Sequence, residues 1–235
     1  MKHLLKVIFL ILSFTCEGQN QSQQLIEQTA QKIGIPTSDI FSRLTTSHKF
    51  ENGTLIVIPE IAEKGDGYVT FNSHIVLIDD ESGAIKAKFR GEKDWNIDAV
   101  SIDNIKIEPK LYQLNESTFG YGLNIFYTGQ SKPNPYSGTE LSLYAREGID
   151  LKQILKDYPI KSFNGETDTK CRGTFEEHSK KLEILKTYTN QYADLQFTDC
   201  IQLSELNEDC DELLKETRQE IKILKFGNGE YRNSM

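Results

Sequence analysis

The chain has 235 residues, of which 37% are hydrophobic and 26% are charged. It is therefore long enough for one large or two small domains and too apolar to be a long disordered polymer. Its formal net charge of −8 argues against nucleic acid as a partner, because phosphate backbones bind basic surfaces.

The first residues have the features of an export signal. Lys2 and Lys6 provide a basic start, and an apolar run at 7–14 follows. This run is too short to remain in a bilayer as a spanning helix. Cys16 comes almost directly after it. The pattern predicts three segments: a signal peptide at 1–15, a polar tether at 16–24 and a single globular domain at 25–235.

The segment Leu12-Ser13-Phe14-Thr15-Cys16, continued by Glu17-Gly18-Gln19, resembles a relaxed lipobox of the kind found in Bacteroidota lipoproteins. The resemblance covers about the first twenty residues. It implies cleavage before Cys16, a diacylglycerol on the Cys16 thiol, and a location in the cell envelope, at the outer membrane or facing the periplasm. Thr15 departs from the small residue usual before the cysteine, so cleavage after Gly18 and secretion is the alternative.

The domain begins with an amphipathic segment. Apolar residues recur at helical spacing within 22–33, and Gly34 and Pro36 follow. This pattern predicts a short helix over 22–33 that ends at Gly34.

The clearest signal is a β-hairpin over 68–90. Apolar and polar residues alternate along both halves, which is typical of strands with one buried face. Glu81-Ser82-Gly83 fits a three-residue loop, with Gly83 in the left-handed conformation. The predicted register pairs Asp79 with Ile85, Leu77 with Ala87, and Ile75 with Phe89.

Further strands are predicted in several stretches with alternating or continuous apolar character: 54–58, 100–107, 119–127, 141–145, 182–188, 193–203 and 221–226. The apolar face of 100–107 changes parity, which predicts a bulge near Asp103-Asn104. Short helices are predicted at 149–158, 175–180 and 205–218. The fold class is therefore mainly β, with antiparallel sheets in a sandwich-like or strongly twisted arrangement and a few short helices. A propeller is disfavoured, since the calcium loop often found in propeller blades is absent.

Three cysteines follow the leader. Cys200 and Cys210 are close in sequence, so a disulfide between them is one hypothesis for an oxidising compartment. Cys171 would then be a buried or free thiol. The alternative is that all three are reduced and act as small hydrophobic residues. There is no Cys-x-x-Cys pair, which disfavours a zinc knuckle.

The segment Pro133-Asn134-Pro135-Tyr136 is the best binding candidate. Two prolines stiffen this loop, and Tyr136 and Tyr127 supply aromatic surface that also carries a polar group. A rigid connection between two strands is the simpler interpretation.

A second candidate is a group of titratable residues at 166–178: Glu166, Asp168, Glu176, Glu177 and His178. Paired acids can perform general acid–base chemistry, as in glycoside hydrolysis. A solvated loop followed by a helix start explains the same residues. No His-Glu-x-x-His motif and no nucleophile elbow is present, so neither a metal nor a cofactor is expected and no catalytic residue is assigned.

These observations favour a non-enzymatic envelope protein, anchored to a membrane through lipid, that binds an envelope protein or a glycan through its loops. The alternatives are an exported hydrolase that uses the acids at 166–177, or an inhibitor or immunity-type protein.

Overall fold

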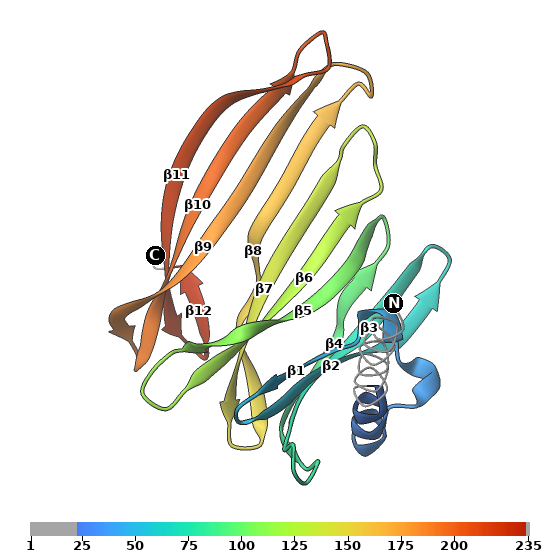
Figure 1. The fold of residues 1–235 in the computed structure, drawn as a ribbon, viewed down its shortest axis with the longest axis vertical. Coiled ribbons are helices and arrows are strands. Elements are labelled where there is room, and N and C mark those ends of the chain that lie inside the picture. The colour runs from blue at the N-terminus through green and yellow to red at the C-terminus, as the bar shows by residue number, and fades with distance from the viewer. Residues whose placement is uncertain (1–22, 234–235) are drawn as a thin grey trace, which may run out of the picture.

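The computed structural model describes residues 23–233 (Figure 1). Residues 23–32 are helical, and two 3-10 turns, Thr37–Asp39 and Ser42–Leu44, lead into the sheet. All remaining regular structure is strand, in the order β1 (Thr46–Phe50), β2 (Gly53–Gly65), β3 (Tyr68–Ile78), β4 (Ile85–Ile97), β5 (Val100–Gln113), β6 (Phe119–Gly129), β7 (Tyr136–Glu147), β8 (Asp150–Thr167), β9 (Gly173–Thr189), β10 (Tyr192–Leu206), β11 (Glu212–Gly227) and β12 (Glu230–Asn233). The predicted mainly β fold is confirmed.

The strands form one continuous sheet made of two antiparallel meanders. The first contains β1–β4 and the second contains β5–β12, each strand pairing with the next. A single parallel contact, Lys88 opposite Asp150, joins β4 to β8. The short connections explain this topology, because tight turns place consecutive strands beside one another.

Bending of the sheet produces two main cores. In the first, β2–β4 pack against β5–β7 around Trp95, Tyr121 and Tyr144, each at most 3% exposed. In the second, the opposite face of β7 packs with β8, β10, β11 and β12 around Leu143 and Phe197. Strand β7 is therefore buried on both faces, as an interior layer requires.

The predicted N-terminal helix is confirmed, and it covers the outer face of β2 and β3. Ile26 and Ala30 pack against Ile56 and Val76 in a small third core. Since the helix includes residues 23–24, it begins before the end of the predicted tether.

The central hairpin is present, with part of the predicted register. Leu77 pairs with Ala87 and Ile75 pairs with Phe89, as predicted, but Ile85 pairs with Ile78. The predicted Asp79–Ile85 pair is wrong, because the register shifts between Leu77 and Ile78. Such a bulge lets the two ends of a hairpin follow different registers.

The loop of this hairpin depends on Gly83, which has φ +64°. The Gly83 N–H donates to the carbonyl of Asp79 at 2.8 Å, and Asp79 N–H donates to the carbonyl of Ala84 at 2.8 Å. Hydrogen bonds from Ser82 and Lys86 to the Asp79 carboxylate hold its pKa well below the usual range. The Asp79 carboxylate therefore stabilises the turn.

Replacing Gly83 with Val is expected to lower the free energy of unfolding by about 1 kcal/mol or more, since a β-branched residue resists positive φ. An added Cβ would meet only the flexible end of Lys32, so the strain would come from the backbone. Gly83→Asn is the matched control, because Asn tolerates this conformation. Urea unfolding measures both, and equal stability of the two variants would contradict the argument.

Three predicted helices are wrong. Residues 150–158 and 175–180 lie in β8 and β9, residue 149 lies in the turn before β8, and residues 205–218 cross from β10 through a turn into β11. Pairing with neighbouring strands overrides their local helical pattern. The predicted bulge in β5 is confirmed, since the β5–β6 register shifts between Ile102 and Asn104.

The ends of β8–β11 extend beyond the cores as a thin layer, as Figure 1 shows. We call residues 161–181 and 198–222 the distal sheet. Along β11, every residue from Glu212 to Ile223 is exposed, so no second layer covers this edge of the described structure.

Candidate functional site

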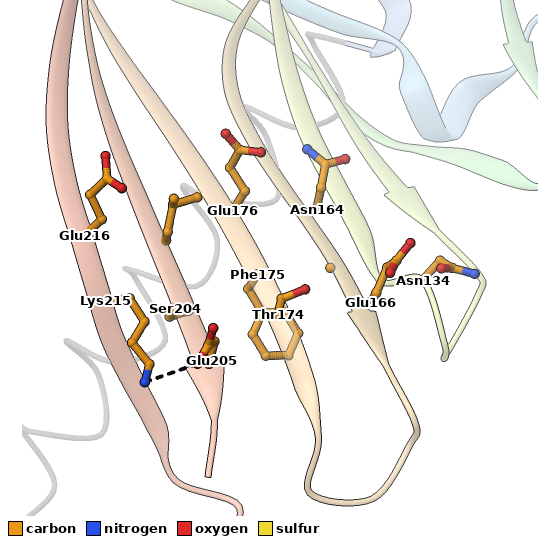
Figure 2. A pocket seen from close by; sticks show the side chains of 12 residues that line it. Asn134, Asn164, Glu166, Thr174, Phe175, Glu176, Ser204, Glu205, Lys215 and Glu216 are labelled. Atoms are coloured by element: carbon orange, nitrogen blue, oxygen red, sulfur yellow. Dashed lines mark ion pairs between the residues drawn. The ribbon is translucent and has the colours of Figure 1, made fainter.

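A groove of about 580 Å³ lies on the distal sheet (Figure 2). It is lined by residues from the β6–β7 loop, β8, β9, β10 and β11: Asn134, Asn164, Gly165, Glu166, Thr174, Phe175, Glu176, Leu203, Ser204, Glu205, Lys215 and Glu216. A second hollow adjoins it and adds Pro133, Asp168 and Arg172. The two candidates from the sequence, the proline loop and the acids, therefore meet at one place.

Backbone hydrogen bonds attach the proline loop to β8. Gly165 N–H donates to the carbonyl of Pro135 at 3.0 Å, and Thr167 N–H donates to the carbonyl of Pro133 at 2.8 Å. A Cβ on Gly165 would come within 2.4 Å of the Phe175 ring, so glycine permits this close packing. The loop is thus a fixed wall of the groove.

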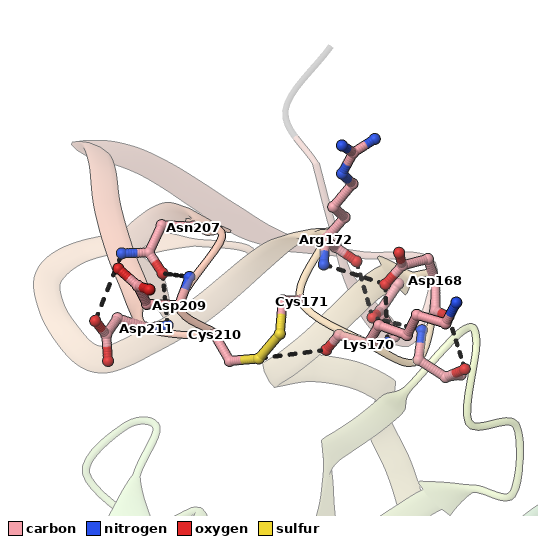
Figure 3. Close-up of a disulfide and its surroundings, with 10 residues drawn as sticks. Asp168, Lys170, Cys171, Arg172, Asn207, Asp209, Cys210 and Asp211 are labelled. Carbon is pink, nitrogen blue, oxygen red and sulfur yellow. Dashed lines mark hydrogen bonds between the residues drawn. A yellow bond between two sulfur atoms is a disulfide. The ribbon is translucent and has the colours of Figure 1, made fainter.

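A disulfide between Cys171 and Cys210 closes the far end of the distal sheet (Figure 3). It joins the β8–β9 and β10–β11 connections, which lie at the same end of the meander. The predicted Cys200–Cys210 pair is wrong. Cys200 lies within β10, opposite Gln219 of β11, and is free, whereas Cys210 lies in the turn beyond the strands.

Hydrogen bonds from backbone N–H groups to side chains within the two turns hold both cysteines in place. The Asn207 side chain accepts hydrogen bonds from the N–H groups of Asp209 and Asp211, at 2.9 and 2.8 Å. In the other turn, Asp168 accepts from the N–H groups of Lys170 and Arg172. These backbone donors hold the pKa of Asp168 below its usual value.

The groove is strongly acidic. Glu166, Glu176, Glu205 and Glu216 line it, and its one basic residue, Lys215, forms an ion pair with Glu205 at 3.1 Å. Figure 2 shows Glu176 and Glu216 pointing the same way from β9 and β11, on either side of β10. Leu203, which pairs with Glu176, adds apolar lining on the same face, so the site suits a cationic group attached to an apolar one.

The predicted binding loop is divided between two surfaces. Pro133 and Asn134 line the groove and its adjoining hollow. Tyr136 lies instead against Gly129 and Gly138, and it lines neither. Tyr136 begins β7, where side chains alternate between the two faces of the sheet.

The acids at 166–178 are divided in the same way. Glu166 and Glu176 line the groove and Asp168 lines the adjoining hollow. Glu177 contributes to a separate, smaller pocket with Phe163 and Leu214. Because residues alternate along β9, Glu176 and Glu177 cannot share one face, so the predicted cluster does not form as a unit.

Sequence reasoning named His178 and Glu176 but missed Asp199 and Lys180, which complete a charged network beside the groove. Asp199, only 7% exposed, lies 2.8 Å from His178 Nδ1 and 3.4 Å from Lys180 Nζ through its Oδ2 atom. The other nitrogen of His178 lies 3.2 Å from Glu176. Both ring nitrogens therefore face carboxylates, so neither is open to a serine or cysteine nucleophile. Only the pairing of β9 with β10 brings these residues together.

A second group missed from the sequence is formed by partly buried residues of β6, β7 and β8. Burial, together with the nearby charge of Asp157, raises the pKa of Glu140. Burial also raises the pKa of Asp157, which accepts a hydrogen bond from Ser142 at 3.1 Å. Burial likewise raises the pKa of Tyr127, which hydrogen-bonds to Glu140. None of these residues lines the groove.

The raised pKa of Glu140 predicts a pH-dependent effect of Glu140→Gln. A carboxyl whose pKa is higher in the folded than in the unfolded state contributes stability below its unfolded value, and that contribution is lost as pH rises through the folded value. The variant is therefore expected to be more stable than wild type at pH 8, with a difference that shrinks towards pH 4. Urea unfolding at both pH values checks this, with exposed Glu116→Gln as the control. A loss of stability that is the same at both pH values would contradict it.

Comparison of the chain with known protein-family models, curated proteins and solved structures gives no match. Across residues 23–233, no helix has the length and apolar character needed to cross a membrane. Within the same residues, no three His, Cys, Asp or Glu side chains gather as metal ligands would. Cys16 and the predicted signal peptide lie outside the described residues.

Proposed function

We propose that this chain is an exported protein, lipidated at Cys16, that binds a cationic segment of another envelope protein in the groove of the distal sheet. The groove carries the proposal. It joins a rigid loop, an apolar lining and four glutamates, in a layer whose tip is tied by a disulfide. A rigid site needs little ordering on binding, which favours affinity.

Export is supported by two independent features. The leader resembles a lipoprotein signal, and the Cys171–Cys210 disulfide suits an oxidising compartment. A lipid on Cys16 would anchor the chain, with the remaining residues before the helix as a tether.

Binding is favoured over hydrolysis. A general acid that works near neutral pH requires a raised pKa. Among the described residues, burial raises the pKa of Glu140 and Asp157, and both lie too far from the groove lining to serve it. The groove acids serve better as fixed charges for a basic partner.

The anchor is tested by expressing the full chain in a bacterium with a lipoprotein pathway, separating the membranes and measuring the intact mass. We expect a membrane-bound product that begins at Cys16 and carries the added lipid, and a soluble product for Cys16→Ala. Cys200→Ala is the control, because it removes a cysteine outside both the leader and the disulfide. A soluble wild-type product that begins at Gln19 would contradict lipidation.

The groove is tested by an affinity pull-down from the envelope of the producing cells, with wild type and with the double variant Glu166→Lys/Glu205→Lys. Reversing two groove charges is expected to reduce capture of basic proteins at least about tenfold, and salt is expected to weaken wild-type capture. The matched control is Glu51→Lys/Glu116→Lys, which makes the same change of charge at exposed positions away from the groove. Equal capture by both double variants would contradict the site.

A further inference from the structure

The outer edge of β11 has one regular open segment. Residues 216–222 pair with β10 on one side, and no other described strand pairs with them. On the N-terminal side a bulge interrupts the ladder, because Leu203 pairs with Glu216 while Ser204 pairs with Leu214. On the other side β12 pairs with β11 from Leu224 onward. The open segment is centred on Gln219.

Exposed edges of this kind tend to pair with other strands. All of residues 216–222 are exposed, and Ile221 is 65% exposed. Charges on an edge can instead prevent pairing. The order of the charges along the segment therefore decides whether this edge can pair with a second strand or is protected from it.

The charges on one face alternate along the segment as Glu216, Arg218, Glu220 and Lys222. In an antiparallel pair of two copies centred on Gln219, Arg218 faces Glu220 of the second copy and Glu216 faces Lys222. On the other face, Thr217 faces Ile221, a β-branched pair that favours sheets. Both charged contacts are then complementary, and Arg218, which already lies 3.2 and 3.4 Å from Glu216 and Glu220 of its own strand, gains a further carboxylate.

Neighbouring registers are disfavoured. A pair centred on Arg218 sets Arg218 against itself and Glu216 against Glu220, and a pair centred on Glu220 sets Glu220 against itself and Arg218 against Lys222. Like charges directly opposite one another are destabilising. Registers shifted further run into the bulge or into β12.

We propose that two copies of this chain pair antiparallel through residues 216–222 of β11, with the two-fold axis at Gln219. The pairing would join the two sheets into one continuous sheet through backbone hydrogen bonds, and it is isologous, as two-fold symmetry requires. Glu216 belongs to both surfaces, but the groove charges tested above, Glu166 and Glu205, lie outside the paired segment.

Disulfide crosslinking tests the register. The full chain, in a Cys200→Ser background, is exported with Gln219→Cys or with Thr217→Cys. Position 219 faces its own copy, with Cα atoms about 4.5–5.5 Å apart, whereas position 217 lies about 13 Å from its copy, too far for a disulfide. We expect a crosslinked species of twice the chain mass for Gln219→Cys, at least about tenfold more abundant than for Thr217→Cys. Equal crosslinking, or none, in protein with native circular dichroism would overturn the proposal.

Exchanging the charges of Arg218 and Glu220 tests the proposed ion pairs between the two copies. Adding Arg218→Glu to Gln219→Cys sets Glu against Glu220 of the second copy, and we expect crosslinking to fall at least about tenfold. Adding Glu220→Arg as well restores opposite charges, and crosslinking is expected to return to within about twofold of the starting level. Crosslinking that is unchanged by Arg218→Glu, or not recovered by the exchange, would overturn the proposal.

Discussion

Replacing Cys210 with Ser is expected to lower the free energy of unfolding by about 3–4 kcal/mol. The Cys171–Cys210 bond joins positions 39 residues apart, and a loop of that size gives about this stabilisation when chain entropy is the main term. The bond also joins the two turns at the tip of an uncovered layer. Its loss should therefore loosen the groove as well as destabilise the fold.

The measurement is urea unfolding of the exported protein. Cys200→Ser is the matched control, expected to change stability by less than about 1 kcal/mol, because Cys200 forms no disulfide. Thiol labelling of the denatured, unreduced protein provides an independent check, with Cys200 as the only reactive cysteine after Cys16. Reaction of Cys171 and Cys210 in that assay would contradict the bond.

Asp199→Asn is expected to destabilise the chain by about 3 kcal/mol. Removing one partner of a buried ion pair leaves the other charge uncompensated. Asp199 is 7% exposed, and the Lys180 side chain beside it is only 15% exposed. The ammonium group would lose its nearest carboxylate while remaining largely shielded from water.

Two further variants show whether loss of the buried ion pair causes the destabilisation by Asp199→Asn. Glu176→Gln, at a 43%-exposed side chain that also contacts His178, is expected to have an effect below about 1 kcal/mol. The double variant Lys180→Met/Asp199→Leu removes both charges and should recover much of the loss, since apolar pairs often replace buried ion pairs without penalty. A double variant as unstable as Asp199→Asn would show that packing at this site, rather than charge, sets its stability.

The sequence alone was sufficient where one face of a strand is buried and the turn is short. The hairpin at 68–90 shows this, since its alternation and Gly83 predict the pairs Leu77–Ala87 and Ile75–Phe89. The β5 bulge and the N-terminal helix were predicted for the same reason: each pattern reflects contacts made within or next to the element itself.

In the distal sheet, the sequence alone did not predict the conformation of residues 205–218. Residues 205–218 have helical spacing, yet Leu213 and Leu214 are exposed and the chain turns at Asn207. Their strand conformation comes from pairing with β10, a contact that local propensity does not encode.

The candidate site shows the same division. The proline loop and the acids were both visible in the sequence, but only the sheet brings Asn134 beside Glu166 and places Tyr136 against Gly129 and Gly138 instead. The partner of Cys210 was equally undetermined, because nearness in sequence favoured Cys200. In the tertiary structure the partner of Cys210 is Cys171. The meander places the β8–β9 and β10–β11 turns at the same end of the sheet, so these two cysteines, distant in sequence, come within bonding distance.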